Sequence, residues 1–135
     1  MLSGKKKYLN LELQRENMNT NGKNYFIAPG IETPEYTAIR KAIDYMGVEI
    51  QHQGYEKKDV FSRKRAMLLV GIRQIIAYML YTYYKLNYSE IGDIFNLHRT
   101  NIYYLICRAK ERIRFERGYN DKISEIISYA TGRKG

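Results

Sequence analysis

Residues 87–106 read NYSEIGDIFNLHRTNIYYLI, and this stretch decides the fold. Asn87 is suited to cap a helix, and Glu90 stands three residues later, as a capping box requires. Asn96 readily takes the left-handed conformation of a tight turn, so this helix is expected to end just before it. A second helix should begin at residue 98 or 99. The stretch therefore predicts two helices joined by a short turn.

The apolar residues of this stretch stand where the two helices would pack on each other. They are Ile91, Phe95, Leu97, Ile102 and Leu105. Gly92 is small at the position where the two backbones would cross. A short-turn helix pair is the geometry that places a recognition helix in the major groove of DNA. We predict a helix-turn-helix at about residues 88–110; the alternative is a helix pair in an all-α domain that binds protein.

The flanking sequence predicts further helices and no strands. Thr33 and Pro34 favour a helix start, which gives a helix at about 34–46 followed by a loop at 48–58. An apolar stripe predicts a long helix from residue 59 or 62 to Lys85. The helix after the turn should continue until Gly118, and a last helix should span about 120–129. The prediction is thus a flexible tail at 1–33 and an all-α multi-helix domain at 34–130.

Positive charge is concentrated in one segment of the 135-residue chain, whose net charge is +9. Residues 57–118 carry thirteen Lys and Arg against five Asp and Glu, so this segment alone has a net charge of +8. Such a segment attracts a polyanion, either nucleic acid or an anionic membrane surface. A basic face that only maintains solubility is the alternative.

Several classes of protein do not fit the sequence. The longest apolar stretch, about residues 66–79, is interrupted by Gly71, Arg73 and Gln74, so no membrane-spanning segment is expected. The chain begins without a secretory signal, which favours the cytoplasm. A lone Cys107 and two histidines predict neither a disulfide nor a metal site. We expect no enzyme and no cofactor, because no catalytic constellation and no Walker-type loop can be found.

Four segments of the chain are similar to one known family. They read AIDYMGV at 42–48, FSRKR at 61–65, RQIIAY at 73–78 and SEIG at 89–92. They resemble the first helix, the Ser-Lys-Lys-Arg stretch, the Arg-Gln-Ile-Ala-Met-Tyr run and the Pro-Glu-Ile-Gly motif of the C-terminal DNA-binding domain of the bacterial replication initiator DnaA. That domain belongs to the Trp-repressor-like helix-turn-helix group. The likeness covers about residues 36–113 and implies this fold and binding of duplex DNA in replication or transcription.

The chain departs from this family at the turn. The family's Gly-Gly-Arg-Asp-His-Thr-Thr-Val corresponds to FNLHRTNI at 95–102, which is one residue shorter before the recognition helix. Thr100 matches a family threonine, but His98 and Arg99 replace the Asp-His pair that reads bases. The family's own target sequence therefore does not carry over, and the turn resembles a generic helix-turn-helix. The resemblance also implies that Arg73 enters the adjacent minor groove, a use that suits arginine.

The exposed N-terminal half of the second helix is expected to read bases. The candidates for base contact are His98, Arg99, Thr100, Asn101, Tyr103 and Tyr104. Arg99 suits a guanine edge and Asn101 an adenine edge, while hydroxyls and methyl groups can meet thymine or phosphate. The candidates for phosphate contact are Arg63, Lys64, Arg65, Lys85 and Arg108.

Two other functions remain open at this stage. The domain could bind a protein partner through its many tyrosines, or bind RNA through the same basic strip. The tyrosines could also stack on single-stranded bases, although at helical spacing they more often form a core with hydroxyls at its rim. The sequence does not decide whether the domain forms a homodimer.

Overall fold

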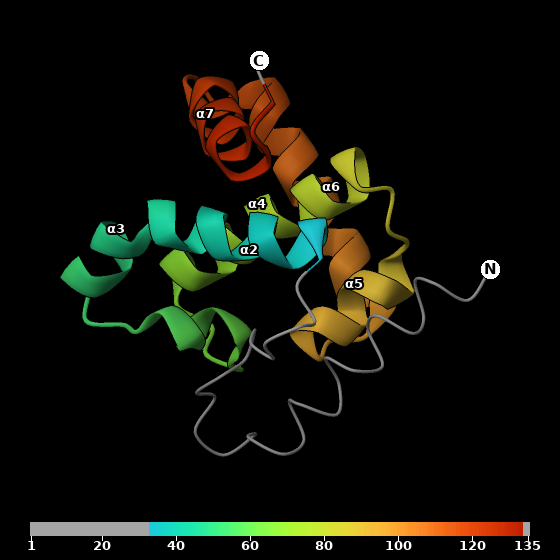
Figure 1. The fold of residues 1–135 in the computed structure, drawn as a ribbon, viewed down its shortest axis with the longest axis horizontal. Coiled ribbons are helices and arrows are strands. Elements are labelled where there is room, and N and C mark those ends of the chain that lie inside the picture. Colours follow the sequence, from blue (N-terminus) through green and yellow to red (C-terminus); the bar gives the residue numbers. More distant parts are fainter. Residues whose placement is uncertain (1–32, 134–135) are drawn as a thin grey trace.

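Helix α4 (Met67–Tyr83) runs through the middle of the molecule, with other helices packed around it (Figure 1). The computed structural model describes residues 33–133, and within them the fold is all-α, as predicted. An α-helix that is apolar on nearly every face is stable only when it is buried on several sides. Its fully buried side chains include Leu69, Ile72, Ile76 and Leu80. The predicted tail at residues 1–33 lies outside the described residues except for Thr33.

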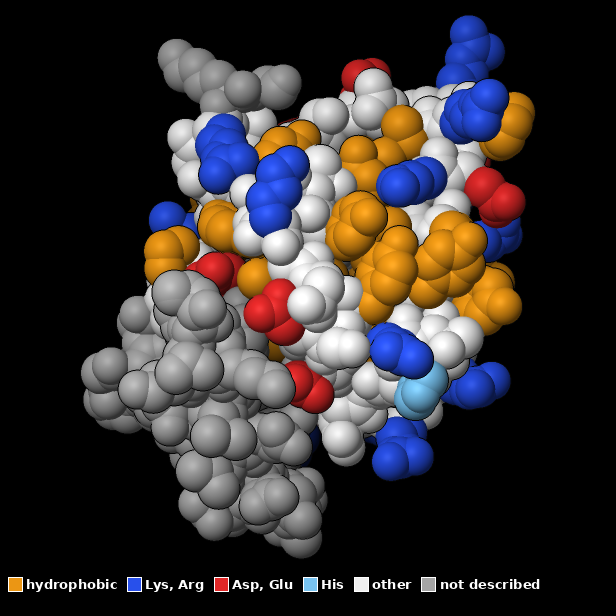
Figure 2. Space-filling model, turned by 90° about the vertical axis from the view of Figure 1, so that its right-hand side faces the viewer, with side chains coloured by type: hydrophobic (Ala, Val, Ile, Leu, Met, Phe, Trp, Pro, Cys, Tyr) orange, Lys and Arg blue, Asp and Glu red, His pale blue; other side chains and the backbone are white. Residues whose placement is uncertain are grey.

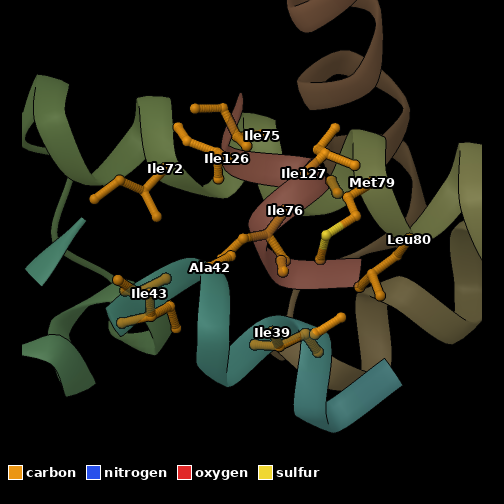
Figure 3. Close-up of a cluster of buried hydrophobic side chains, with 14 of the residues drawn as sticks. Ile39, Ala42, Ile43, Ile72, Ile75, Ile76, Met79, Leu80, Ile126 and Ile127 are labelled. Carbon is orange, nitrogen blue, oxygen red and sulfur yellow. The ribbon is translucent and has the colours of Figure 1, made fainter. Parts of the chain in front are cut away.

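Helices α2 (Pro34–Tyr45) and α7 (Tyr119–Thr131) pack on α4. Thr33 caps α2 as predicted, because its hydroxyl accepts the Tyr36 N–H at 3.2 Å. In the core, apolar side chains of the three helices meet (Figure 3). They include Ile39, Ala42 and Ile43 of α2, Ile72, Ile75, Ile76 and Met79 of α4, and Ile126 and Ile127 of α7.

The segment between α2 and α4 is more ordered than the sequence suggests. It contains α3 (Gly47–His52) and a 3-10 helix, η1 (Lys57–Phe61), where we predicted a loop at 48–58. That prediction was wrong because each short helix packs on the core through a single buried apolar residue, Ile50 in α3 and Val60 in η1. A single apolar residue creates no helical periodicity in the sequence.

The start of α4 also differs from the prediction. The sequence favoured a helix from residue 59 or 62, but α4 begins at Met67, after Ala66 in an extended conformation. Residues 62–66 form a connection that lies beside α4 instead of extending it. The reason is the side chain of Arg73, whose hydrogen bonds are described below.

Helices α5 (Tyr88–Phe95) and α6 (Arg99–Phe115) follow, and the predicted bounds of α5 and start of α6 are confirmed. Asn87 and Glu90 form the capping box through bonds of 2.8 and 2.9 Å. Asn96 adopts the left-handed conformation, with φ 58° and ψ 45°. Helix α6 ends before Gly118, which has φ 81° and immediately precedes α7.

The backbones of α5 and the turn approach closely at Gly92. A Cβ atom at this position would lie 2.4 Å from the carbonyl oxygen of Leu97, which is closer than real contacts allow. The Leu97 N–H in turn donates to the Gly92 carbonyl at 2.9 Å. Gly92 therefore sets how tightly α5 can pack against the start of α6.

Replacing Gly92 tests this packing, and Gly71 offers a matched control. Gly92→Ala should lower the free energy of unfolding by about 1–3 kcal/mol, because the new methyl group overpacks a backbone contact. Gly71→Ala in α4 should stabilise by up to about 1 kcal/mol through helix propensity, since its Cβ would meet only Arg112 Nη1 at 3.7 Å. Urea unfolding followed by circular dichroism measures both. Equal stability of the two variants would contradict the close approach.

Candidate nucleic-acid interface

The N-terminal half of α6 presents one buried and one exposed face. Ile102 and Ile106 point into the core and are almost completely buried. Five of the six predicted base readers lie on the exposed side of α6 itself: Arg99, Thr100, Asn101, Tyr103 and Tyr104. The helix thus offers polar and aromatic side chains to solvent over its first two turns.

The sixth predicted base reader, His98, caps α6. Its Nδ1 accepts the N–H of Thr100 at 3.1 Å, which satisfies one of the unpaired donors at the helix start. The imidazole is exposed, and because its Nδ1 already accepts the Thr100 N–H, its Nε2 is the ring nitrogen available to a ligand. His98 therefore has a structural role that the sequence did not predict.

A groove of about 790 Å³ lies between α6 and the connection at residues 62–66. Asn101, Tyr104 and Arg108 line it from α6, and Arg63 and Arg65 line it from the connection. Segments about forty residues apart in the sequence thus form one concave surface with arginines on both sides. We call this surface the arginine groove.

The predicted phosphate contacts divide between the arginine groove and other places. Arg63 and Arg65 are exposed, and Arg108 is exposed while paired with Glu111 at 2.8 Å. Lys64 is turned toward Asp59, with Nζ 3.1 Å from a carboxylate oxygen. Lys85 lies outside the groove, in the connection between α4 and α5, where it has φ 58°.

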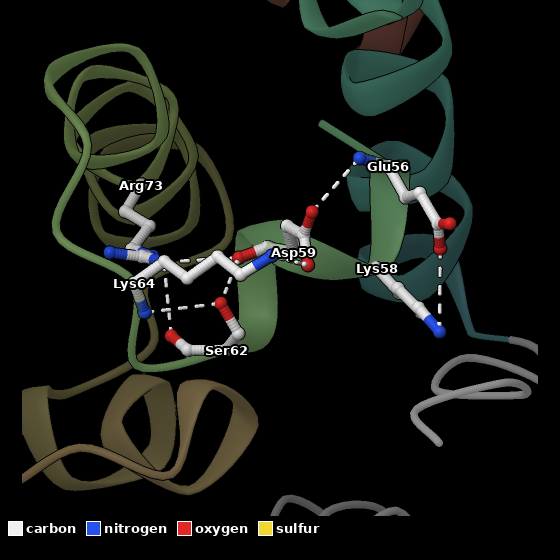
Figure 4. A network of polar contacts seen from close by, with 6 residues as sticks. All are labelled: Glu56, Lys58, Asp59, Ser62, Lys64 and Arg73. Atoms are coloured by element: carbon white, nitrogen blue, oxygen red, sulfur yellow. Dashed lines mark hydrogen bonds and ion pairs between the residues drawn. The ribbon is translucent and has the colours of Figure 1, made fainter. Parts of the chain in front are cut away.

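Arg73 contradicts the role that the resemblance implies. Its side chain is 6% exposed, and its guanidinium donates to the carbonyls of Val60 (2.7 Å), Asp59 (3.0 Å) and Ser62 (3.0 Å). Figure 4 shows this cation pointing into the segment that precedes α4. The fold itself holds this guanidinium, so its observed role is structural and not the minor-groove contact that the resemblance implies.

Asp59 completes the network around Arg73 (Figure 4). Its carboxylate accepts the N–H of Glu56 at 2.9 Å and pairs with Lys64. Burial alone would raise the pKa of Asp59, but the Glu56 N–H and the Lys64 ammonium outweigh it and lower the pKa below its usual value. Burial lowers the pKa of Arg73, although arginine remains charged at physiological pH.

A second arginine connects α6 to the rest of the fold. Arg112 donates to Gln74 of α4 at 3.0 Å and binds both carboxylate oxygens of Glu116 at 2.8 and 3.0 Å. It also lies 4.2 Å from the ring centre of Tyr119, at the start of α7. The pair with Glu116 has helical i,i+4 spacing, but no sequence pattern predicts the bond to Gln74, which lies 38 residues from Arg112.

Within residues 33–133 there is no group of His, Cys, Asp and Glu side chains suited to hold a metal ion. None of the helices described between Thr33 and Arg133 has the length and apolarity needed to cross a membrane. Comparisons with protein-family models, curated proteins and solved structures found no match to this chain. The site must therefore be interpreted from its own residues.

Substituting Arg73 distinguishes a structural role from a DNA contact. Arg73→Lys should lower the free energy of unfolding by about 1–3 kcal/mol, because an ammonium lacks the fork of separated donors with which the guanidinium bonds three carbonyls at once. Arg65 is exposed in the connection before α4, so the same substitution there, Arg65→Lys, should change the free energy of unfolding by less than about 0.5 kcal/mol. Urea unfolding measures both. A variant Arg73→Lys of normal stability but weakened DNA binding would restore the minor-groove role.

Proposed function

We propose that this protein binds duplex DNA sequence-specifically, with α5 and α6 acting as a helix-turn-helix. The observation that carries the proposal is the arginine groove beside the exposed N-terminal half of α6. An α-helix fits the major groove of B-DNA, and its N-terminal residues are the ones that reach base edges in helix-turn-helix proteins.

In this proposal, the first turns of α6 read the bases. Arg99 and Asn101 are exposed. An arginine side chain can form bidentate hydrogen bonds with a guanine edge, and an asparagine side chain can do so with an adenine edge. Thr100 and Tyr103 contact a thymine methyl group or a phosphate. Tyr104, which is 63% exposed, lies on the exposed side of α6 with these residues and also lines the arginine groove.

The arginine groove then holds the DNA backbone. Arg63 and Arg65 face α6 across the groove, so a phosphate strand beside the inserted helix would meet cations on both sides. Arg108 and Lys64 add charge after exchanging or sharing their carboxylate partners, Glu111 and Asp59, and Lys85 adds charge from the α4–α5 connection. Contacts of this kind supply affinity that depends on salt and not on sequence.

Duplex DNA is favoured over the two alternatives. An A-form RNA duplex has a major groove too narrow for a helix such as α6. A protein partner would not require the net charge of +8 carried by residues 57–118. A role in replication or transcription follows only from the resemblance to the DnaA domain. Binding of a homodimer to a palindromic site is compatible with the proposed duplex contact.

The test is binding-site selection from a random duplex pool with the wild type, Arg99→Ala and Arg117→Ala. The wild type should yield a motif, and Arg99→Ala should lose preference at one position by about 1–3 kcal/mol. Arg117 is also exposed but lies beyond the far end of α6, so Arg117→Ala should keep every position.

A salt series completes this experiment. Apparent affinity should fall by orders of magnitude between 50 and 200 mM salt, at about the rate that six or more phosphate contacts produce. Absence of duplex binding at low salt, or a motif that Arg99→Ala and Arg117→Ala alter alike, would reject the proposal.

A further inference from the structure

Four tyrosine rings form a row that runs across three helices. Tyr81 of α4 stacks on Tyr88 of α5, with ring centres 5.2 Å apart and planes at 16°. Tyr88 meets Tyr103 of α6 at 5.6 Å, and Tyr103 meets Tyr104 at 5.4 Å, both edge to face. We call these four residues the tyrosine row.

The outer end of the tyrosine row is open to solvent. Tyr103 is 44% exposed and Tyr104 is 63% exposed, while Tyr81 and Tyr88 are half-buried and support them. Figure 2 shows the side of the molecule that carries the α4–α5 connection, where hydrophobic side chains gather with Lys and Arg side chains around them. Large exposed rings on a folded domain mark an interaction surface.

Cations lie toward the α4 end of the tyrosine row. Lys110 lies 5.4 Å from the ring centre of Tyr81, and Lys85 is exposed in the α4–α5 connection. Arg133 lies 5.4 Å from the ring of Tyr83 and 5.5 Å from that of Tyr84, next to the row. Glu90, the nearby acid at the start of α5, accepts the Asn87 N–H in the capping box. The capping-box bond leaves the Glu90 carboxylate charged, but Lys85 and Lys110 outnumber it, so the net charge of the rim is positive and its complement is a polyanion.

We propose that the tyrosine row binds single-stranded DNA, with bases stacked on Tyr103 and Tyr104 and phosphates near Lys85 and Lys110. Single-strand sites combine aromatic platforms with a basic rim, because every base has a π-face and every nucleotide a negative charge. Paired bases already stack on their neighbours and do not offer their faces to a side chain. A second copy of the chain would place two positive rims against each other.

Side-chain hydrogen bonds favour the neutral form of two phenols of the row, those of Tyr88 and Tyr103. A bond with Tyr81 raises the pKa of Tyr88, and a bond with Cys107 raises the pKa of Tyr103. These two phenols therefore add no negative charge that would repel phosphates at neutral pH. The stacking surface shares Tyr103 and Tyr104 with the proposed duplex contact, and the choice of DNA over RNA rests on that proposal, since α6 carries both.

The experiment measures anisotropy of a fluorescein-labelled dT15 oligonucleotide at low salt. The wild type should bind it, and replacing both Tyr103 and Tyr104 with Leu should weaken binding fivefold or more, as loss of about one base stack predicts. Replacing both with Phe should stay within about twofold of the wild type, because the rings remain. Tyr129→Leu, at a similarly exposed tyrosine on α7 that contacts Tyr45, should bind like the wild type.

The outcomes separate this proposal from the duplex one. Duplex binding without dT15 binding overturns the single-strand site alone, and dT15 binding without duplex binding overturns the duplex proposal alone. Leu variants that bind dT15 like the wild type, or a Tyr129→Leu variant weakened equally, also overturn the single-strand site.

Tighter binding of U15 than of dT15 assigns the row to RNA, and self-association lost in the Leu variants assigns it to a dimer. Quenching of tyrosine fluorescence by unlabelled dT15 gives a second readout, since the chain contains no Trp.

Discussion

The buried guanidinium of Arg73 is the interaction on which the candidate interface depends. It bonds the carbonyls of Asp59, Val60 and Ser62, and the Asp59 carbonyl also accepts the N–H and the hydroxyl of Ser62. These bonds fix the end of η1 against α4 and direct the connection after it along α6. Arg63 and Arg65 consequently face α6 across a groove instead of continuing a helix. An arginine expected to touch DNA thus contributes to the proposed interface through the fold.

Helix α4 carries this arrangement because it is shared by both halves of the molecule. It packs against α2 and α7 in the core and supports α6 on another side. Arg112 adds a polar connection, since its guanidinium bonds Gln74 of α4 and lies on the ring of Tyr119 at the start of α7. The orientation of the exposed N-terminal half of α6 is therefore set by the whole core, and the close approach at Gly92 sets only the local angle between α5 and α6.

Local signals in the sequence were sufficient for the helix pair. The capping box at Asn87 and Glu90 and the left-handed Asn96 act within four residues, so the pattern alone predicted the turn correctly. The partners of Arg73 lie 11 to 14 residues before it, and no period marks them. Residues 59–66 therefore resembled the first turns of α4 in sequence. The tyrosines were visible in the composition, but their alignment into a row depends on how α4, α5 and α6 pack.

The most direct measurement is an amide chemical-shift titration of the isotope-labelled protein with a blunt 15-base-pair duplex at low salt. The proposed interface predicts that the largest shifts fall in residues 62–66 and 98–108, on both sides of the arginine groove. Amides of α2 and α7, which lie in another part of the fold, should move little. Shifts concentrated on α2 and α7, or no shifts at any duplex concentration, would contradict the account.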